Sequence, residues 1–319
     1  MRLAKNPVDP FRPYAWLVED ERTADGLVEP VSTLFLTNRE CPFRCVYCDL
    51  WKNTTDETVP LGAIPAQMDF ALSQLPATRH IKLYNSGNFF DVRAIPPDDY
   101  PAIARRVAHC RTVIVENHPR LCGESVLRFR DLLSEHSQFE IAMGLETIDP
   151  DTLPRLEKQM SLDDFSRACE FLRKNNIAVR AFVLLKAPWQ NDESTAIDWA
   201  IRSVQWAIDQ GVRVSCVIPT RRGNAALEDL HAAGQFAPPQ LSSLEQVLDT
   251  LLQQKSPAGD PRVFVDTWDL AQFASCKLCL DARRERLETM NRTQTVLPSP
   301  PCECRAMERS FPRDGSFSG

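Results

Sequence analysis

Short apolar segments and amphipathic segments alternate along the middle of the chain, and this alternation constrains the fold more than any other feature. The apolar segments are rich in Val, Ile and Phe, and their lengths are typical of buried parallel strands. They cover residues 32–37, 80–85, 112–116, 140–145, 179–185 and 212–218.

Helical patterns separate these expected strands. In residues 161–176, apolar side chains recur at helical spacing and Ser161 is the expected N-cap. A second pattern covers residues 192–210, and Gly211 is placed to end that helix. Further helices are expected at residues 63–75, 98–109, 124–135 and 241–251.

Six strand–helix repeats in a row predict an α/β fold with a parallel sheet and right-handed crossovers. Because there are six repeats rather than eight, we expect a partial TIM barrel, (β/α)6, with a doubly wound open sheet as the alternative. We divide the chain into an N-terminal extension (1–30), the barrel core (31–260) and a small cysteine-containing C-terminal extension (261–319). In either fold, the chemistry belongs at the C-terminal ends of the strands.

Charge and hydropathy restrict the partners of the chain. Its 319 residues include 37 Lys and Arg against 43 Asp and Glu, which gives a net charge of −6. Such a chain does not attract phosphate backbones through its overall field, so a nucleic-acid partner requires a local basic patch or a helper protein. No apolar run is long enough to span a membrane and residues 1–30 do not resemble a secretory signal, so we expect a cytoplasmic protein. Eleven cysteines in a reducing compartment favour metal binding over disulfides.

Cys41, Cys45 and Cys48 have the spacing C-x3-C-x2-C and follow the first expected strand. Three thiolates on one short loop can bind three irons of a [4Fe–4S] cluster and leave the fourth iron open for the amino and carboxylate groups of S-adenosylmethionine (SAM). Unrelated thiols or a zinc loop are the alternatives, but zinc usually takes four ligands. The spacing and its place after a strand resemble the signature of the radical SAM superfamily.

The resemblance implies that one electron from the cluster cleaves SAM to methionine and a 5′-deoxyadenosyl radical, which abstracts hydrogen from a substrate. It implies that Tyr47 packs beside the adenine. Asn85, Ser86 and Gly87 stand where the superfamily meets the SAM amino group, and Glu146 stands where an acidic residue binds the ribose hydroxyls. An ordinary turn and a surface glutamate are the alternative interpretations of these two segments.

Two further ionisable residues end expected strands. Glu116 ends the third strand and Lys186 ends the fifth, so both are candidate catalytic residues that line the pocket. Lys186 is placed to pair with the SAM carboxylate or with a substrate anion, although a structural role is equally compatible with its position. The resemblance also implies a reduced ferredoxin or flavodoxin as the electron donor.

A closer resemblance follows from the amino-acid sequences of several segments. Together they resemble the archaeosine-forming radical SAM enzymes of archaea over most of the chain, and they lie at residues 82–91, 116–119, 144–147, 182–188 and 236–243. That family cleaves a C–N bond in a lysine adduct of a 7-deazaguanine base in tRNA, which implies a modified tRNA base as substrate. The acidic charge favours a small metabolite or peptide instead. A non-catalytic metal-binding scaffold is the alternative from another class of protein.

A second group of cysteines lies near the C-terminus, at Cys276, Cys279, Cys302 and Cys304. Four thiolates in two pairs predict a metal site, which is either a tetrahedral zinc site or an auxiliary iron–sulfur cluster. The sequence leans slightly towards zinc. The other four cysteines are expected to be buried small apolar residues, namely Cys110, Cys122, Cys169 and Cys216.

Overall fold

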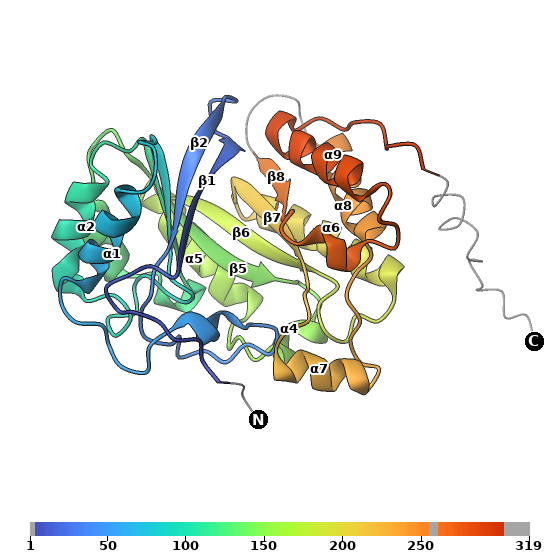
Figure 1. Cartoon of the computed structure of the whole chain (residues 1–319), viewed down its shortest axis with the longest axis horizontal. Coiled ribbons are helices and arrows are strands. Elements are labelled where there is room, and N and C mark those ends of the chain that lie inside the picture. The colour runs from blue at the N-terminus through green and yellow to red at the C-terminus, as the bar shows by residue number, and fades with distance from the viewer. Residues whose placement is uncertain (1–3, 255–260, 303–319) are drawn as a thin grey trace, which may run out of the picture.

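The structure is a computed structural model that describes residues 4–254 and 261–302. It contains one curled sheet of eight strands, and the order of the strands in the sheet is their order in the chain (Figure 1). The strands are β1 (Ala15–Arg22), β2 (Val28–Phe35), β3 (His80–Tyr84), β4 (Thr112–Glu116), β5 (Gln138–Glu146), β6 (Ala178–Leu185), β7 (Val214–Pro219) and β8 (Arg262–Val265).

The strand order identifies the sheet as a partial TIM barrel. Strands β2 to β8 pair in parallel with their neighbours in sequence, whereas a doubly wound sheet requires the order to reverse at a switch point. Strand β1 precedes them and pairs antiparallel with β2. Among the described strands, β1 and β8 form the two edges of the sheet and do not pair with each other. The partial barrel is therefore confirmed, and the doubly wound alternative is wrong.

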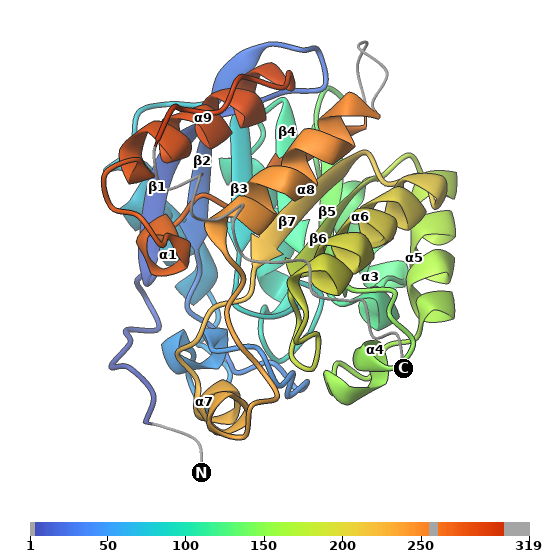
Figure 2. The same cartoon turned by 90° about the vertical axis from the view of Figure 1, so that its right-hand side faces the viewer.

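The helices cover the outer face of the curled sheet (Figures 1 and 2). The α-helices are α1 (Ala63–Leu72), α2 (Tyr100–Arg106), α3 (Glu124–Arg130), α4 (Thr152–Arg155), α5 (Leu162–Lys174), α6 (Glu193–Asp209), α7 (Ala225–Ala232), α8 (Leu241–Gln253) and α9 (Leu280–Thr293). Short 3-10 helices are η1 (Leu50–Asn53), η2 (Pro97–Asp99), η3 (Pro119–Leu121) and η4 (Leu270–Phe273). In the described residues, no helix combines the length and the apolar character needed to cross a membrane.

The six predicted strands are found as β2 to β7, and the predicted helix signals are found with them. Ser161 caps α5 in a reciprocal capping box with Asp164, because each side chain accepts the backbone N–H of the other residue. Gly211 follows α6 with a φ of +88°, a conformation that glycine adopts without a steric penalty.

The expected terminal extensions both contribute to the sheet, which the sequence did not predict. The N-terminal segment supplies β1, and the segment after residue 260 supplies β8, which pairs with β7. Helix α9 then packs against both β1 and β8 (Figure 2). The side chain of Asn291 accepts the backbone N–H of Val265 at 3.0 Å and donates to its carbonyl at 2.8 Å. The boundary expected at residue 260 therefore does not separate the tail from the barrel.

Candidate active site

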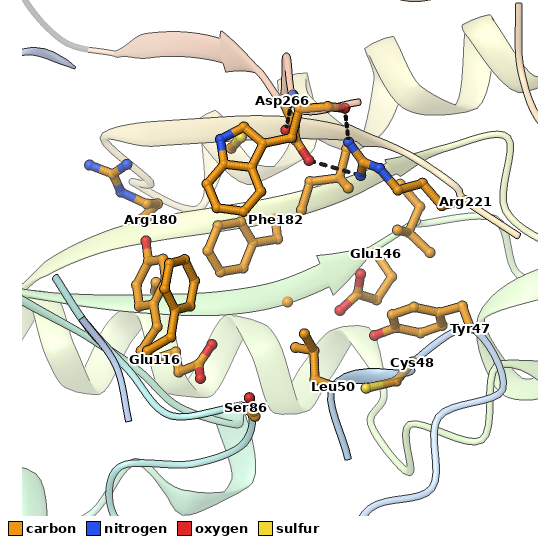
Figure 3. Close-up of a pocket in the computed structure, with 18 of the residues that line it drawn as sticks. Tyr47, Cys48, Leu50, Ser86, Glu116, Glu146, Arg180, Phe182, Arg221 and Asp266 are labelled. Carbon is orange, nitrogen blue, oxygen red and sulfur yellow. Dashed lines mark hydrogen bonds and ion pairs between the residues drawn. The ribbon is translucent and has the colours of Figure 1, made fainter. Parts of the chain in front are cut away.

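A cavity of about 790 Å³ lies inside the curled sheet at the C-terminal ends of its parallel strands. Cys41, Cys45 and Cys48 line it, although they come from the loop after β2. Figure 3 shows Cys48 on one side of the cavity, with Tyr47 and Glu146 close by. Parallel strands bring their C-terminal ends to one edge, so the segments that follow different strands meet here.

Hydrogen bonds hold the cysteine loop from two sides. The side-chain amide of Asn224, which follows β7, donates to the carbonyls of Val46 at 3.1 Å and Cys48 at 3.3 Å. On the other side, Asn88 donates its side-chain N–H to the Sγ of Cys41 at 3.2 Å. These hydrogen bonds restrain the backbone of the cysteine loop and the orientation of Cys41.

The three thiols suit an iron–sulfur cluster. Burial raises the pKa of Cys41 to about 11 and that of Cys48 to about 12, and it also raises the pKa of Cys45. The thiols are therefore protonated near neutral pH, and a bound cation would have to displace those protons. In the described part of the chain, these three sulfurs are not gathered within 4.8 Å of one another. Three thiols on one short loop can bind three irons of a cubane.

The turn after β3 is shaped by Glu116 from the end of β4. The Glu116 carboxylate accepts the backbone N–H of Asn85 at 2.5 Å and of Gly87 at 3.2 Å. Asn38 completes the support: its side chain donates to the Asn85 carbonyl at 2.5 Å and accepts from the Asn85 side chain at 2.6 Å. Glu116 is therefore a positioning residue for this turn.

The same turn contacts the cysteine loop closely. A Cβ at Gly87 would lie 3.2 Å from the Cβ of Cys41, which is tighter than ordinary contact. Ser86 has a φ of +54°, and its hydroxyl lies 2.8 Å from the hydroxyl of Tyr14. Ser86 and Gly87 line the cavity, whereas Asn85 is buried behind it.

Glu146 is directed into the cavity by an irregularity at the end of β5. The pairing of β5 with β6 shifts register between Gly144 and Glu146, and Glu146 has a φ of +66°. Its Oε1 accepts a hydrogen bond from the Nζ of Lys158 at 2.8 Å, and both side chains are buried. Burial alone would lower the pKa of Lys158, but Glu146 and Cys45 raise it above its usual range. The ammonium therefore stays charged beside the Glu146 side chain.

Gly144 provides the space for this ion pair. A Cβ at this position would lie 1.9 Å from the Oε1 of Glu146 and 2.6 Å from the Nζ of Lys158. Tyr47, whose pKa is raised well above its usual range by burial and by Glu146, completes this side of the cavity. The predicted residues Tyr47 and Glu146 are thus brought together with Cys48 (Figure 3).

His118 links the cysteine loop to Lys158. Its Nδ1 accepts the backbone N–H of Arg120 at 3.2 Å, so its Nε2 carries the proton and donates to the Lys158 carbonyl at 3.0 Å. Burial lowers the pKa of His118 to about 3, which keeps the ring neutral. The ring stacks on Phe43, between the first two cysteines, with centroids 3.8 Å apart.

The inner part of the cavity is charged. Arg180 donates to Glu21 and to Glu140 at 2.6 Å each, and Lys82 donates to Glu21 at 2.5 Å. Burial would raise the pKa of Glu21, but Arg180 and Lys82 lower it well below its usual range. At the rim, Arg221 pairs with Asp266 at 2.9 Å (Figure 3).

No family model matches the chain. Archaeosine synthase subunit beta from Methanosarcina acetivorans is 25% identical over 275 residues, which cover 82% of this chain and 78% of that protein. The crystal structure of methylornithine synthase is 14% identical with a TM-score of 0.52, over 82% of this chain and 70% of that one. SuiB from Streptococcus suis bound to S-adenosylmethionine is 12% identical with a TM-score of 0.51, over 77% of this chain and 53% of that one.

The sequence similarity to archaeosine synthase subunit beta and the fold shared with the solved structures are both consistent with a cysteine loop at the C-terminal ends of the strands. The chain therefore resembles radical SAM enzymes in sequence and in fold. Radical SAM enzymes use SAM and a [4Fe–4S] cluster, and the cysteines and carboxylates that line this cavity are donors suited to both groups.

Lys186 lies apart from the cavity that the three cysteines line. It does not line the cavity, and its buried ammonium forms an ion pair with Glu193 at the start of α6. The physical reason is the backbone: Lys186 has a φ of +58°, which turns the chain as β6 ends. This placement supports the structural role that the sequence left open for Lys186.

Several residues that support the candidate site were not predicted from the sequence. Asn38, Asn88 and Asn224 hold loops through side-chain amides, and Lys158 holds Glu146. The signal available in the sequence was a polar residue shortly after an expected strand or shortly before an expected helix. This signal does not predict the direction in which the side chain points.

We expect the substitution Gly144→Ala to weaken SAM binding by about tenfold or more, because the added methyl displaces the Glu146–Lys158 pair and one good charged hydrogen bond contributes roughly 1.5–3 kcal/mol. The measurement is calorimetric titration of SAM into the anaerobically reconstituted enzyme. Gly123→Ala is the matched control, because a Cβ there meets nothing within 4 Å. Equal affinity in both variants would contradict the role of Glu146.

A second prediction concerns Glu116, whose pKa burial raises from 4.5 to about 7. The folded state therefore favours the protonated acid, so this group stabilises the fold below pH 4.5 and its contribution is lost as the pH rises towards about 7. Relative to Glu116→Gln, which is always neutral, the wild-type free energy of unfolding should fall across this window. Chemical denaturation of the metal-free protein measures it. The exposed Glu285→Gln variant should follow the wild type, and a constant difference between wild type and Glu116→Gln would refute the shift.

Proposed function

We propose that the enzyme binds a [4Fe–4S] cluster through Cys41, Cys45 and Cys48 and holds SAM between the turn at Ser86 and Gly87 and the carboxylate of Glu146. The supporting observation is that one cavity is lined by all of these residues, although they come from the segments after β2 and β3 and from the last residue of β5. A reduced cluster bound there would supply the electron that cleaves SAM to methionine and a 5′-deoxyadenosyl radical, which abstracts hydrogen from the substrate.

The residues of the chain have separate tasks in this proposal. The three thiolates bind metal, and Glu116 and Asn38 fix the turn that meets the SAM amino group. Glu146 accepts hydrogen bonds from the ribose hydroxyls, because a carboxylate has enough acceptor sites for both hydroxyls and for Lys158.

The inner cavity supports a planar, polar substrate. Phe35, Tyr84 and Phe182 line it, with ring centroids 6.2 Å apart for the first pair and 6.1 Å for the second. Aromatic faces stack on nucleobases, while charged side chains such as Arg180 and Lys82 can bind polar groups on the base edge. We therefore propose a modified base of tRNA as the substrate, with C–N bond cleavage of the archaeosine type. The similarity to archaeosine synthase subunit beta supports this proposal.

The acidic charge of the enzyme bears on how it would reach tRNA. A net charge of −6 provides little general attraction for an RNA backbone. The similar protein is named as a subunit, so we propose that a partner protein supplies most of the tRNA contacts and that this enzyme receives the extruded base. A reduced ferredoxin or flavodoxin in the cytoplasm would supply the electron.

Anaerobic reconstitution with iron, sulfide, dithionite and SAM tests the proposal. We expect the wild type to release 5′-deoxyadenosine, measured by chromatography, and Cys45→Ala to release at least about a hundredfold less because its cluster lacks a ligand. Cys110→Ser is the matched control, since Cys110 is buried outside the cavity. A wild type that holds a full cluster but releases no 5′-deoxyadenosine would leave a non-catalytic metal-binding scaffold.

The substrate is tested in the same reaction. tRNA that carries the lysine adduct of the deazaguanine base should raise 5′-deoxyadenosine release, and its base should appear as the amidine. Addition of salt should weaken the effect, because contacts with phosphates depend on ionic strength. If tRNA has no effect even at low salt while the adduct nucleoside is converted alone, the substrate is a small metabolite.

A further inference from the structure

Three cysteines from two separate segments of the chain meet beside α9. Cys276 and Cys279 precede the helix, and Cys302 lies on the segment that follows it. Their sulfur atoms all lie within 4.8 Å of one another, and those of Cys276 and Cys302 are 3.9 Å apart. Cys279 is buried and the other two are half-buried.

Contacts along the tail explain why Cys302 returns to the start of α9. The guanidinium of Arg286, in the middle of the helix, donates to the carbonyl of Leu297 at 2.7 Å and to that of Pro298 at 3.1 Å. It also forms an ion pair with Asp249 of α8 at 2.6 Å. The chain after α9 therefore runs back along the helix, and it arrives at Cys276 and Cys279 without any metal being invoked.

The distance between the sulfur atoms distinguishes one metal ion from a cluster. Zinc binds thiolates at about 2.3 Å in a tetrahedron, which places two sulfurs about 3.8 Å apart. Thiolates on separate irons of a cubane stand further apart, because their bonds diverge from different corners. The group of three has the closer spacing, whereas Cys41, Cys45 and Cys48 are not gathered within that limit in the described residues.

We propose that Cys276, Cys279 and Cys302 bind one structural zinc ion rather than an auxiliary iron–sulfur cluster. The fourth ligand expected from the sequence is Cys304, which lies outside the described residues. Three or four thiolates around Zn²⁺ leave a net negative charge. Cys279 occupies the N-cap position of α9, where the helix dipole stabilises such a charge.

The zinc ion would fix α9 as one wall of the cavity. Glu288, Asn291 and Arg292 of this helix line the cavity, and the helix bridges β1 and β8 at the open side of the barrel. Leu287 and Met290 of α9 are buried in the main core, and the buried pair of Arg283 with Glu245 of α8 at 2.9 Å adds a polar contact. A metal that joins the start of the helix to the returning tail restrains the whole segment and stabilises its placement.

Metal analysis of the full-length, anaerobically purified enzyme tests the proposal. We expect about one zinc and about four irons per chain. Cys279→Ser should lose most of the zinc and keep the iron, whereas Cys45→Ala should lose the iron and keep the zinc. Cys110→Ser is the matched control and should keep both. About eight irons without zinc, or a zinc content that Cys279→Ser leaves unchanged, would overturn the assignment.

Cobalt substitution keeps the test independent of whether the Cys279→Ser variant folds. Wild-type enzyme grown with Co²⁺ in place of zinc should show the visible bands of tetrahedral cobalt and near-ultraviolet thiolate-to-cobalt absorption. Removal of the metal with a chelator should speed amide hydrogen exchange in α9 at least about tenfold, while exchange in β4 stays unchanged. Absence of the cobalt bands would overturn the site, and unchanged exchange in α9 would overturn its structural role.

Discussion

The direction of the strands is the constraint on which the rest of this structure depends. Seven consecutive strands run parallel, so the segments that leave β2, β3, β4 and β5 all emerge at one edge of the sheet. A loop with three cysteines, a turn with a glycine and two glutamates are therefore brought around one cavity without any of them being close in sequence. Curling of the sheet encloses this cavity, and α9 covers the gap between its edges.

Buried polar contacts give the site its detailed shape. Glu116 gathers two backbone N–H groups of one turn, and Lys158 fixes the carboxylate of Glu146. Burying a charge costs free energy unless the charge is paired. Each of these groups and its hydrogen-bond partners therefore hold one another in place. Gly144 and Gly87 contribute because they have no side chain: a Cβ at either position would lie too close to atoms of the site.

Much of the fold was predictable because its signals are local and repeated. Strands β2 to β7 show as apolar segments of the expected length, and Ser161 marks the start of α5 through its own hydrogen bonds. Strand β8 has four residues, too few to show a period, and β1 is half-exposed without regular alternation. Both were therefore missed, although they complete the sheet.

The site was predictable only where a motif carries its own chemistry. The cysteine spacing was sufficient for Cys41, Cys45 and Cys48 to line the cavity as expected. Lys158 and Lys186 show the limit of prediction from sequence, because the role of each residue depends on where its side chain points in the folded chain. Lys158 reaches Glu146 from a later loop, whereas Lys186 turns away to Glu193.

The central claim is that three cysteines hold a cluster with an iron left open for SAM in this cavity. Electron paramagnetic resonance of the reduced, reconstituted enzyme before and after addition of SAM tests it most directly. The account predicts a [4Fe–4S] signal whose g values change when SAM is added, because SAM becomes a ligand of the open iron. A cluster signal that SAM leaves unchanged, or one that survives the loss of Cys41, Cys45 and Cys48, would contradict it.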